Sequence, residues 1–302
     1  MEKKSNLIQR TLTGVLFVAV LVGGIMYSPL SFTCLFCLIT ALAVHEYCQL
    51  INNRPNSEVR LPTTLLIAAS VYLFIAQVLY MTMGTMAAFA PYFLFIIGIM
   101  VRELYLKRRN PMGDWAYAML SQIYIALPFS LLVWLYLFFS QPELSTNSVL
   151  LPDFVGNSEV FRASFLLPLS IFIFLWANDT GAYCVGSLLG RHRLFPRISP
   201  AKSWEGFIGG LVIAALISLL IWHIDSRYLA AYTVGEWIGL ALVVAGFGTW
   251  GDLVESLLKR QLGIKDSGRI LPGHGGMLDR FDSSLLAIPA ALCYLFLIEY
   301  CC

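Results

Sequence analysis

About nine stretches of roughly 20 mainly apolar residues follow one another along this chain. A helix of that length crosses the hydrocarbon core of a bilayer, where every backbone polar group must be satisfied internally. Only 13% of the 302 residues are charged and 58% are hydrophobic, which is far from the composition of a soluble domain. The sequence therefore predicts an all-α polytopic integral membrane protein, with spans at roughly 12–29, 31–51, 61–82, 84–101, 116–139, 163–187, 206–223, 234–257 and 284–300.

Lysine and arginine fall almost entirely on one side of these spans. Of the 20 such residues, only Arg162 and Arg227 lie on the other side. Because cytoplasmic loops carry the excess of Lys and Arg, we expect a cytoplasmic N-terminus and an external C-terminus. The apolar stretch after Arg10 resembles a signal peptide, but its length and the lack of a small-residue cleavage site predict a retained helix.

The short loops favour a bacterial cytoplasmic (inner) membrane over an organelle membrane. The net charge of +2 predicts that the protein does not bind nucleic acid. Cys301 and Cys302 form a terminal pair, but their expected external position argues against lipidation.

Polar residues are distributed unevenly along the chain. The first five spans hold almost no ionisable side chain in their middle, and His45 and Glu46 lie near the predicted cytoplasmic end of the second. From residue 176 onward, polar residues come in clusters. We expect one integrated membrane domain with an N-terminal scaffold half, residues 1–160, and a C-terminal catalytic half, residues 161–302.

The first cluster lies within the sixth span. A carboxylate such as Asp179 costs about 2.5–3.5 kcal/mol in a span on insertion scales, so it is expected to face a polar cavity or a partner. Structural contact between helices is the alternative. Gly186 and Gly190 have the GxxxG spacing that favours close helix packing.

The second cluster precedes the seventh span. Pro200 and Ser203 are typical of a helix start, whose free N–H groups would attract an anion together with Lys202. A capped helix with a lysine directed to the headgroups remains the alternative. Two roles are open for Glu205. It is an acidic residue that offsets the helix dipole, or it is a ligand.

The third cluster ends the eighth span. Helical spacing places Asp252, Ser256 and Lys259 on one face, so a carboxylate, a hydroxyl and an ammonium converge. An ion pair between Glu255 and Lys259 is the structural alternative.

A Gly-rich loop, residues 262–277, follows this helix. Its glycines can leave backbone N–H groups open to an anion, and Asp279 and Asp282 can face one site. Mg²⁺ prefers carboxylate oxygens and substrate phosphates, which suits this mixture. His274 has no second histidine nearby, so a hydrogen bond is favoured over zinc ligation.

Residues 256–282, SLLKRQLGIKDSGRILPGHGGMLDRFD, resemble the signature of the phosphatidate cytidylyltransferase (CDP-diacylglycerol synthase) family. That signature reads S-x-hydrophobic-K-R, four residues, K-D-x-small, then a run ending H-G-G-x-x-D-R-x-D. Every specified position is filled, by Ser256, Lys259, Arg260, Lys265, Asp266, Gly268, Pro272, His274, Gly275, Gly276, Asp279, Arg280 and Asp282. The segments GDLVES, NDTGAY and ISPAKSWEG are also similar, with Ser203 where a threonine is common.

The resemblance implies that CTP and phosphatidic acid give CDP-diacylglycerol and pyrophosphate with a divalent metal, usually magnesium. Another divalent ion or an added monovalent cation is left open. The implied partners are CTP, phosphatidic acid and bilayer lipid, with a homodimer left open. The alternatives are a CTP-dependent lipid kinase, a cytidylyltransferase of another lipid phosphate and, more remotely, an ion-coupled transporter.

The expected site residues fall into three groups, which we expect to meet on the cytoplasmic face. The metal ligands are Asp252 and Asp279, with Ser256 and Asp282 as helpers. The catalytic residues are Lys202, Lys259, Arg260, Asp279 and Asp282. The substrate-binding residues are Asp179, Ser199, Lys202, Ser256, Lys265, Asp266, His274, Gly275, Gly276 and Arg280.

Overall fold

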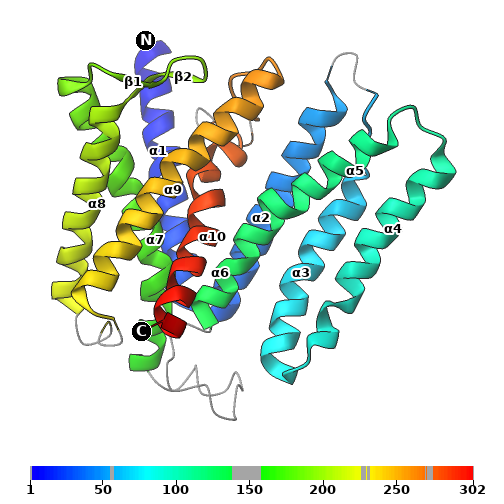
Figure 1. Cartoon of the computed structure of the whole chain (residues 1–302), viewed down its shortest axis with the longest axis horizontal. Coiled ribbons are helices and arrows are strands. Elements are labelled where there is room, and N and C mark those ends of the chain that lie inside the picture. The colour runs from blue at the N-terminus through cyan, green and yellow to red at the C-terminus, as the bar shows by residue number, and fades with distance from the viewer. Residues whose placement is uncertain are drawn as a thin grey trace. The chain divides into compact units, whose positions relative to one another are not determined.

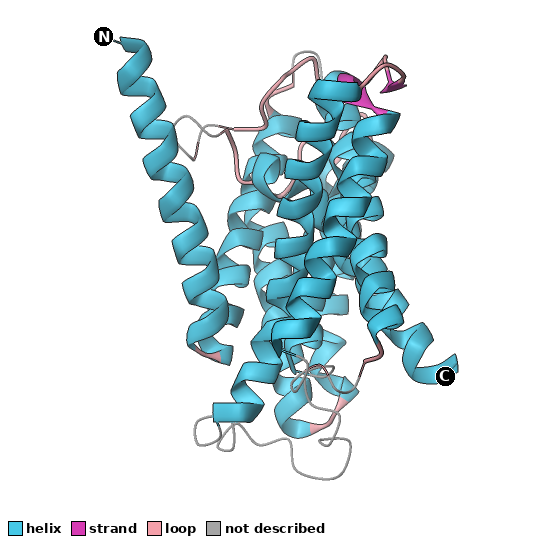
Figure 2. Cartoon of the chain, turned by 90° about the vertical axis from the view of Figure 1, so that its left-hand side faces the viewer, coloured by secondary structure: helices cyan, strands magenta, loops and turns pink. Residues whose placement is uncertain are grey.

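The structure is a computed structural model that describes residues 2–54, 58–137, 158–225, 229, 232–268, 270 and 275–301. Helices dominate these residues, as Figure 2 shows. Within the described ranges, 8 helical segments are long and apolar enough to cross a membrane, and a shorter apolar helix covers Thr11–Tyr27. The predicted all-α polytopic membrane fold is confirmed.

The elements follow the predicted spans in order (Figure 1). They are α1 (Glu2–Tyr27), α2 (Pro29–Asn52), α3 (Thr63–Met83), the 3-10 helix η1 (Met86–Phe89), α4 (Ala90–Leu106), α5 (Pro111–Leu120), the π-helix η2 (Ser121–Ala126), α6 (Leu127–Leu137), α7 (Ser158–Leu189), β1 (Arg193–Phe195), β2 (Ser199–Ser203), α8 (Trp204–Asp225), α9 (Val234–Gln261) and α10 (Leu278–Cys301). Each predicted span overlaps at least one of these elements; the span at 84–101 covers η1 and part of α4, and the span at 116–139 overlaps α5, η2 and α6.

Local sequence signals set several helix ends. A capping box of Ser28 and Ser31 starts α2, and one of Thr233 and Glu236 starts α9, so that backbone N–H groups of the first turn have acceptors. Helix α3 ends at Met83 and is followed by Gly84, whose φ of 66° lies in the left-handed region that suits glycine.

The chain forms two compact units. Among the described residues, the first unit contains the chain up to Trp134 together with Asp266–Arg280. The second contains α7, the β1–β2 hairpin, α8, α9 and Phe281–Cys302. The Gly-rich loop therefore belongs mainly to the first unit, although it follows α9 in sequence.

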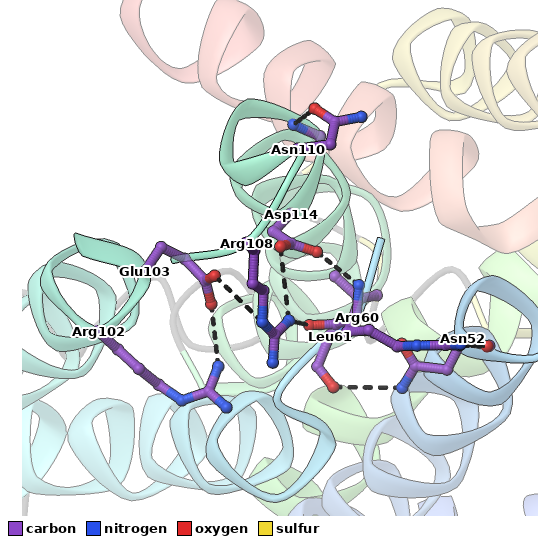
Figure 3. A network of polar contacts seen from close by, with 9 residues as sticks. Asn52, Arg60, Leu61, Arg102, Glu103, Arg108, Asn110 and Asp114 are labelled. Carbon is purple, nitrogen blue, oxygen red and sulfur yellow. Dashed lines mark hydrogen bonds and ion pairs between the residues drawn. The ribbon is translucent and has the colours of Figure 1, made fainter. Parts of the chain in front are cut away.

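Two buried carboxylates join the ends of α4 and α5 in the first unit (Figure 3). Glu103 and Asp114 are only 3% and 2% exposed, and the guanidinium of Arg108 lies between them, 3.5 Å and 3.4 Å away. Arg102 adds a second cation 2.9 Å from Glu103, and the Arg60 N–H donates to Asp114 at 2.5 Å. Each buried carboxylate is therefore compensated by charge and by hydrogen bonding.

Helices α7 and α8 of the second unit pack closely through glycines. A Cβ atom at Gly206 would lie 2.8 Å from the Ala182 carbonyl oxygen and 3.2 Å from the Gly186 Cα. One at Gly209 would lie 2.5 Å from Val185. The close packing predicted at Gly186 is confirmed, and it brings the polar segment of α7 next to the start of α8.

An antiparallel hairpin, β1 with β2, precedes α8, and it pairs Arg193 with Ser203. The sequence-based placement of Pro200 at a helix start is wrong, because Pro200 lies within β2 and α8 begins only at Trp204. A strand of a two-stranded hairpin tolerates proline because one of its edges needs no ladder hydrogen bond. The capping role of Ser203 is confirmed, since its hydroxyl accepts the Gly206 N–H at 3.1 Å.

Candidate active site

Asp252 is the centre of a polar cluster in the second unit. Its Oδ1 accepts the hydroxyl of Ser256 at 3.2 Å, one turn further along α9. Its Oδ2 lies 2.6 Å from Nζ of Lys202, which β2 contributes. The two charged side chains are 30% and 26% exposed, so the ion pair is open to solvent. Of the predicted shared face of Asp252, Ser256 and Lys259, the contact between Asp252 and Ser256 is confirmed, and Lys202 joins these two residues.

Thr249 connects three elements around this cluster. Its carbonyl oxygen accepts from Nζ of Lys202 at 3.4 Å, and its hydroxyl accepts from Nδ2 of the buried Asn178 at 3.2 Å. The same hydroxyl donates to the Ala245 carbonyl, one turn back in α9, at 3.1 Å. The lysine is thus held by α9, while α7 is fixed to α9 next to it.

Two further carboxylates approach Asp252 from α7 and α10. Asp179 interacts electrostatically with Lys202 and Asp252, and Asp282 interacts electrostatically with Asp252 and Lys259. At Gly251, α9 and α10 cross so closely that a Cβ atom there would lie 2.6 Å from the Asp282 carbonyl oxygen. Three helices of the second unit therefore bring carboxylates toward one polar region, which we call the Asp252 cluster.

Lys259 pairs with Glu255, four residues earlier on α9, and the Glu255 carboxylate is completely buried. The structural alternative for these two residues is therefore present. Because Lys259 is 14% exposed and also acts electrostatically on Asp282, its charge still contributes to the Asp252 cluster.

Another pair of carboxylates organises the Gly-rich loop of the first unit. Oδ2 of Asp279 accepts the backbone N–H groups of Ser267 at 2.9 Å and Gly276 at 2.8 Å. Gly275 has a φ of 84°, which side-chain-bearing residues rarely adopt. The carboxylate of Glu46, on α2, also accepts from this loop. The N–H of Gly276, predicted to face an anion, is here directed to Asp279.

The donor set of the Asp252 cluster fits magnesium. Mg²⁺ is commonly held by one or two carboxylates plus substrate phosphates and water, and the cluster supplies carboxylate and hydroxyl oxygens. Across the described ranges, no group of three or more His, Cys, Asp or Glu side chains is close enough to form a complete metal site.

The remaining predicted site residues lie in β2, in α9, in the Gly-rich loop and in α10. Ser199 lies in β2 and is partly buried. The exposed residues are Arg260, Lys265, Asp266 and Arg280. His274 and Pro272 lie outside the described residues.

Sequence reasoning assigned no role to several residues that organise these clusters. Glu46 could have been singled out, because a carboxylate in an apolar helix signals a buried partner. Thr249 and Gly251 carry no such signal, since their roles come from helix crossings. Glu205, which was expected to offset the helix dipole or to act as a ligand, instead accepts the N–H groups of Arg191 and His192 at 3.1–3.2 Å and fixes the chain entering the hairpin.

The chain matches the family model described as "Cytidylyltransferase family" over residues 8–298. It is 49% identical over 120 residues to a phosphatidate cytidylyltransferase of Staphylococcus aureus (strain COL). It is 47% identical over 120 residues to proteins of the same name from Staphylococcus saprophyticus and Staphylococcus haemolyticus. Each of these matches covers 39% of this chain and 44% of the relative, so it spans less than half the length of those curated relatives.

Proposed function

Because the chain belongs to the cytidylyltransferase family, we propose that it is an integral membrane nucleotidyltransferase acting on CTP and phosphatidic acid. The products would be CDP-diacylglycerol and pyrophosphate, which places the reaction in phospholipid biosynthesis. The family match over residues 8–298 is the observation that carries this proposal. Similarity to relatives named phosphatidate cytidylyltransferase supports the choice of the lipid substrate.

In the proposed reaction, a phosphate oxygen of phosphatidic acid attacks the alpha phosphorus of CTP. A new P–O bond forms, the bond from that phosphorus to the bridging oxygen breaks, and pyrophosphate leaves with that oxygen. The lipid phosphate is already mostly ionised near neutral pH, with a second pKa of about 6, so no general base is needed. The protein's contribution is therefore to position the phosphates and to neutralise their charge.

The Asp252 cluster supplies the charges for this task. Lys202 and Lys259 would bind phosphate oxygens, and Thr249 keeps Lys202 in place through its carbonyl oxygen. Exposed ion pairs stabilise a protein by only about 0.2–1 kcal/mol, so a triphosphate can replace the Asp252 carboxylate as the partner of Lys202. Asp179 would orient a cation or close the cavity around these groups.

We assign metal binding in the second unit to Asp252, with Ser256 and Asp282 as helpers, and in the first unit to Asp279, and we take the metal to be magnesium. When bound, Mg²⁺ would neutralise phosphate oxygens and stabilise the leaving pyrophosphate. Asp279 and the Gly275–Gly276 turn would contribute to binding the phosphates, as would Arg260 and Arg280. The ligand types at Asp252 and Ser256 support this assignment, since both offer oxygen to a hard cation.

The site is proposed to open to the cytoplasm of a bacterial inner membrane. The asymmetric distribution of Lys and Arg supports this orientation. CTP would come from the cytoplasm and phosphatidic acid from the adjacent leaflet. A homodimer is compatible with this arrangement and is not needed for it.

Incubation of the purified full-length protein with radiolabelled CTP, Mg²⁺ and phosphatidic acid tests the proposed function. We expect labelled CDP-diacylglycerol and one pyrophosphate for each lipid product. Omission of phosphatidic acid, or its replacement by diacylglycerol, is the control and should abolish product. Phosphorylated diacylglycerol would instead identify a lipid kinase, and ion uptake without CTP consumption would identify a transporter.

A further inference from the structure

Glu46 is a buried charge to which the proposed chemistry gives no role. It lies on α2 and is only 3% exposed. Burying a carboxylate is costly unless hydrogen bonds or opposite charges compensate it. The hydrogen bonds to its carboxylate come from residues 221 to 232 positions later in the chain, in the Gly-rich loop and at the start of α10.

The carboxylate of Glu46 acts as a helix cap from outside the helix. Its Oε2 accepts the Met277 N–H at 2.8 Å, and its Oε1 accepts the Leu278 N–H at 3.2 Å. These N–H groups stand at the start of α10, where no carbonyl of the same helix can accept them and where the helix dipole is positive. A negative charge here therefore stabilises both the bend into α10 and its first turn.

The loop is shaped around the same carboxylate. Oε1 also accepts the Ser267 hydroxyl, and a Cβ atom at Gly276 would overlap it. A Cβ atom at Gly268 would lie 2.6 Å from Oε2. These two glycines thus allow the loop to approach Glu46, which is a different requirement from leaving N–H groups open to an anion.

Ser267 links Glu46 to Asp279. Its hydroxyl donates to Glu46, while its backbone N–H donates to Asp279 at 2.9 Å. Gly276 completes the connection, because it lies against Glu46 and donates its N–H to Asp279 at 2.8 Å. A shift of the loop away from Glu46 would displace both donors that orient the Asp279 carboxylate.

We infer that Glu46 is a positioning residue, which fixes the Gly-rich loop and thereby orients Asp279 for binding metal and phosphates. The part about metal and phosphates rests on the proposed function. The anchoring of the loop does not, because all of its contacts lie within the first unit and involve no ligand.

Hydrogen exchange of the metal-free full-length protein tests the anchoring without any turnover. Glu46→Gln removes the charge and turns one acceptor into a donor, so we expect exchange at the Met277 and Leu278 amides to accelerate by at least about 10-fold. Glu103→Gln is the matched control, since Glu103 is equally buried in the same unit and is paired with Arg102 and Arg108. It should leave exchange at these two amides unchanged.

Kinetics test the action on Asp279. For Glu46→Gln we expect a 10–100-fold loss of kcat/KM and a higher Mg²⁺ concentration for half-maximal rate, as for other residues that orient metal ligands. Glu103→Gln should keep the wild-type Mg²⁺ dependence. A purely structural role would lower the amount of active enzyme and leave the half-maximal Mg²⁺ concentration unchanged.

Ser267→Ala gives a second test if Glu46→Gln does not fold, because it removes only one hydroxyl. It should shift exchange and Mg²⁺ dependence in the same directions by smaller factors. The inference fails if the variants that fold match Glu103→Gln in both measurements. If the wild-type protein makes no CDP-lipid, the proposed function fails, and the exchange experiment still decides the anchoring.

Discussion

At the scale of single residues, the Lys202–Asp252 ion pair holds two opposite charges in a solvent-accessible position. A buried pair would be hard to separate, but this one is about one quarter to one third exposed. Thr249 contacts Lys202, and Ser256 contacts Asp252. Each charged side chain therefore keeps a hydrogen-bond partner when the other binds a ligand. In the proposed reaction, the cluster would therefore be arranged before the substrates bind, which is the condition for electrostatic catalysis.

Replacing Asp252 by Asn should test this arrangement directly. The substitution keeps the shape but removes the charge that would hold a metal, so we expect at least a 100-fold loss of CDP-lipid formation, the size typical of losing one electrostatic catalytic group. Asp225→Asn, the same change at the end of α8, should retain wild-type activity. Normal Mg²⁺-dependent turnover by Asp252→Asn would contradict the metal assignment.

The residues of the site differ in how far sequence predicts them. Asp252 and Ser256 were predictable because their contact is local to one helix, at i and i+4. The partners of Glu46 were not predictable, because more than 200 residues separate it from Ser267 and no local sequence pattern indicates such a contact. The choice of Glu255 as partner of Lys259 was stated as an alternative, because both interpretations satisfy helical spacing.

At the scale of elements, the glycines between α7 and α8 set the position of the hairpin and of Lys202. Lipid provides little hydrophobic drive between helices, so close backbone packing must hold this pair. GxxxG spacing predicted that packing. The hairpin escaped prediction because its strands are short and because Pro200 and Ser203 are also common at helix starts.

Gly206→Ala should destabilise the second unit. Its new methyl group would lie 2.8 Å from the Ala182 carbonyl oxygen, a backbone atom that cannot rotate away, and overpacking typically costs about 1–3 kcal/mol. Thermal unfolding in detergent should show a lower midpoint. Gly235→Ala, in α9 with open space around it, is the control and should be neutral or stabilising. An unchanged midpoint for Gly206→Ala would argue against tight α7–α8 packing.

At the scale of the whole molecule, the helices follow hydropathy closely because only helices of this length satisfy their backbone in lipid. The assignment of Asp266–Arg280 to the first unit follows no such rule. This assignment depends on the buried carboxylate of Glu46 in α2 and on the glycines that let the loop approach that carboxylate. These contacts join residues far apart in the sequence, so no local pattern predicts them. From its position in the sequence alone, this segment would be assigned to the second unit, which contains its neighbours on both sides.

The proposed orientation can be measured with single cysteines in a variant whose 7 native cysteines are replaced by serine. Asn53→Cys, after α2, should react with an impermeant maleimide only once cells are opened, because the loop is expected to be cytoplasmic. Ala87→Cys, before α4, should react in intact cells. The opposite pattern would reverse the topology and place the site outside.

The length of α9 has a consequence for how the two proposed substrates would reach Asp252. Its 28 residues rise about 42 Å, whereas the hydrocarbon core is only about 30 Å thick. Asp252 comes about 27 Å after Val234, so a helix that enters the core at Val234 places Asp252 just inside the opposite boundary, next to the headgroup layer. A lipid would then find the enzyme by diffusion in two dimensions without leaving its leaflet, and only the nucleotide would have to descend from water to the headgroup layer.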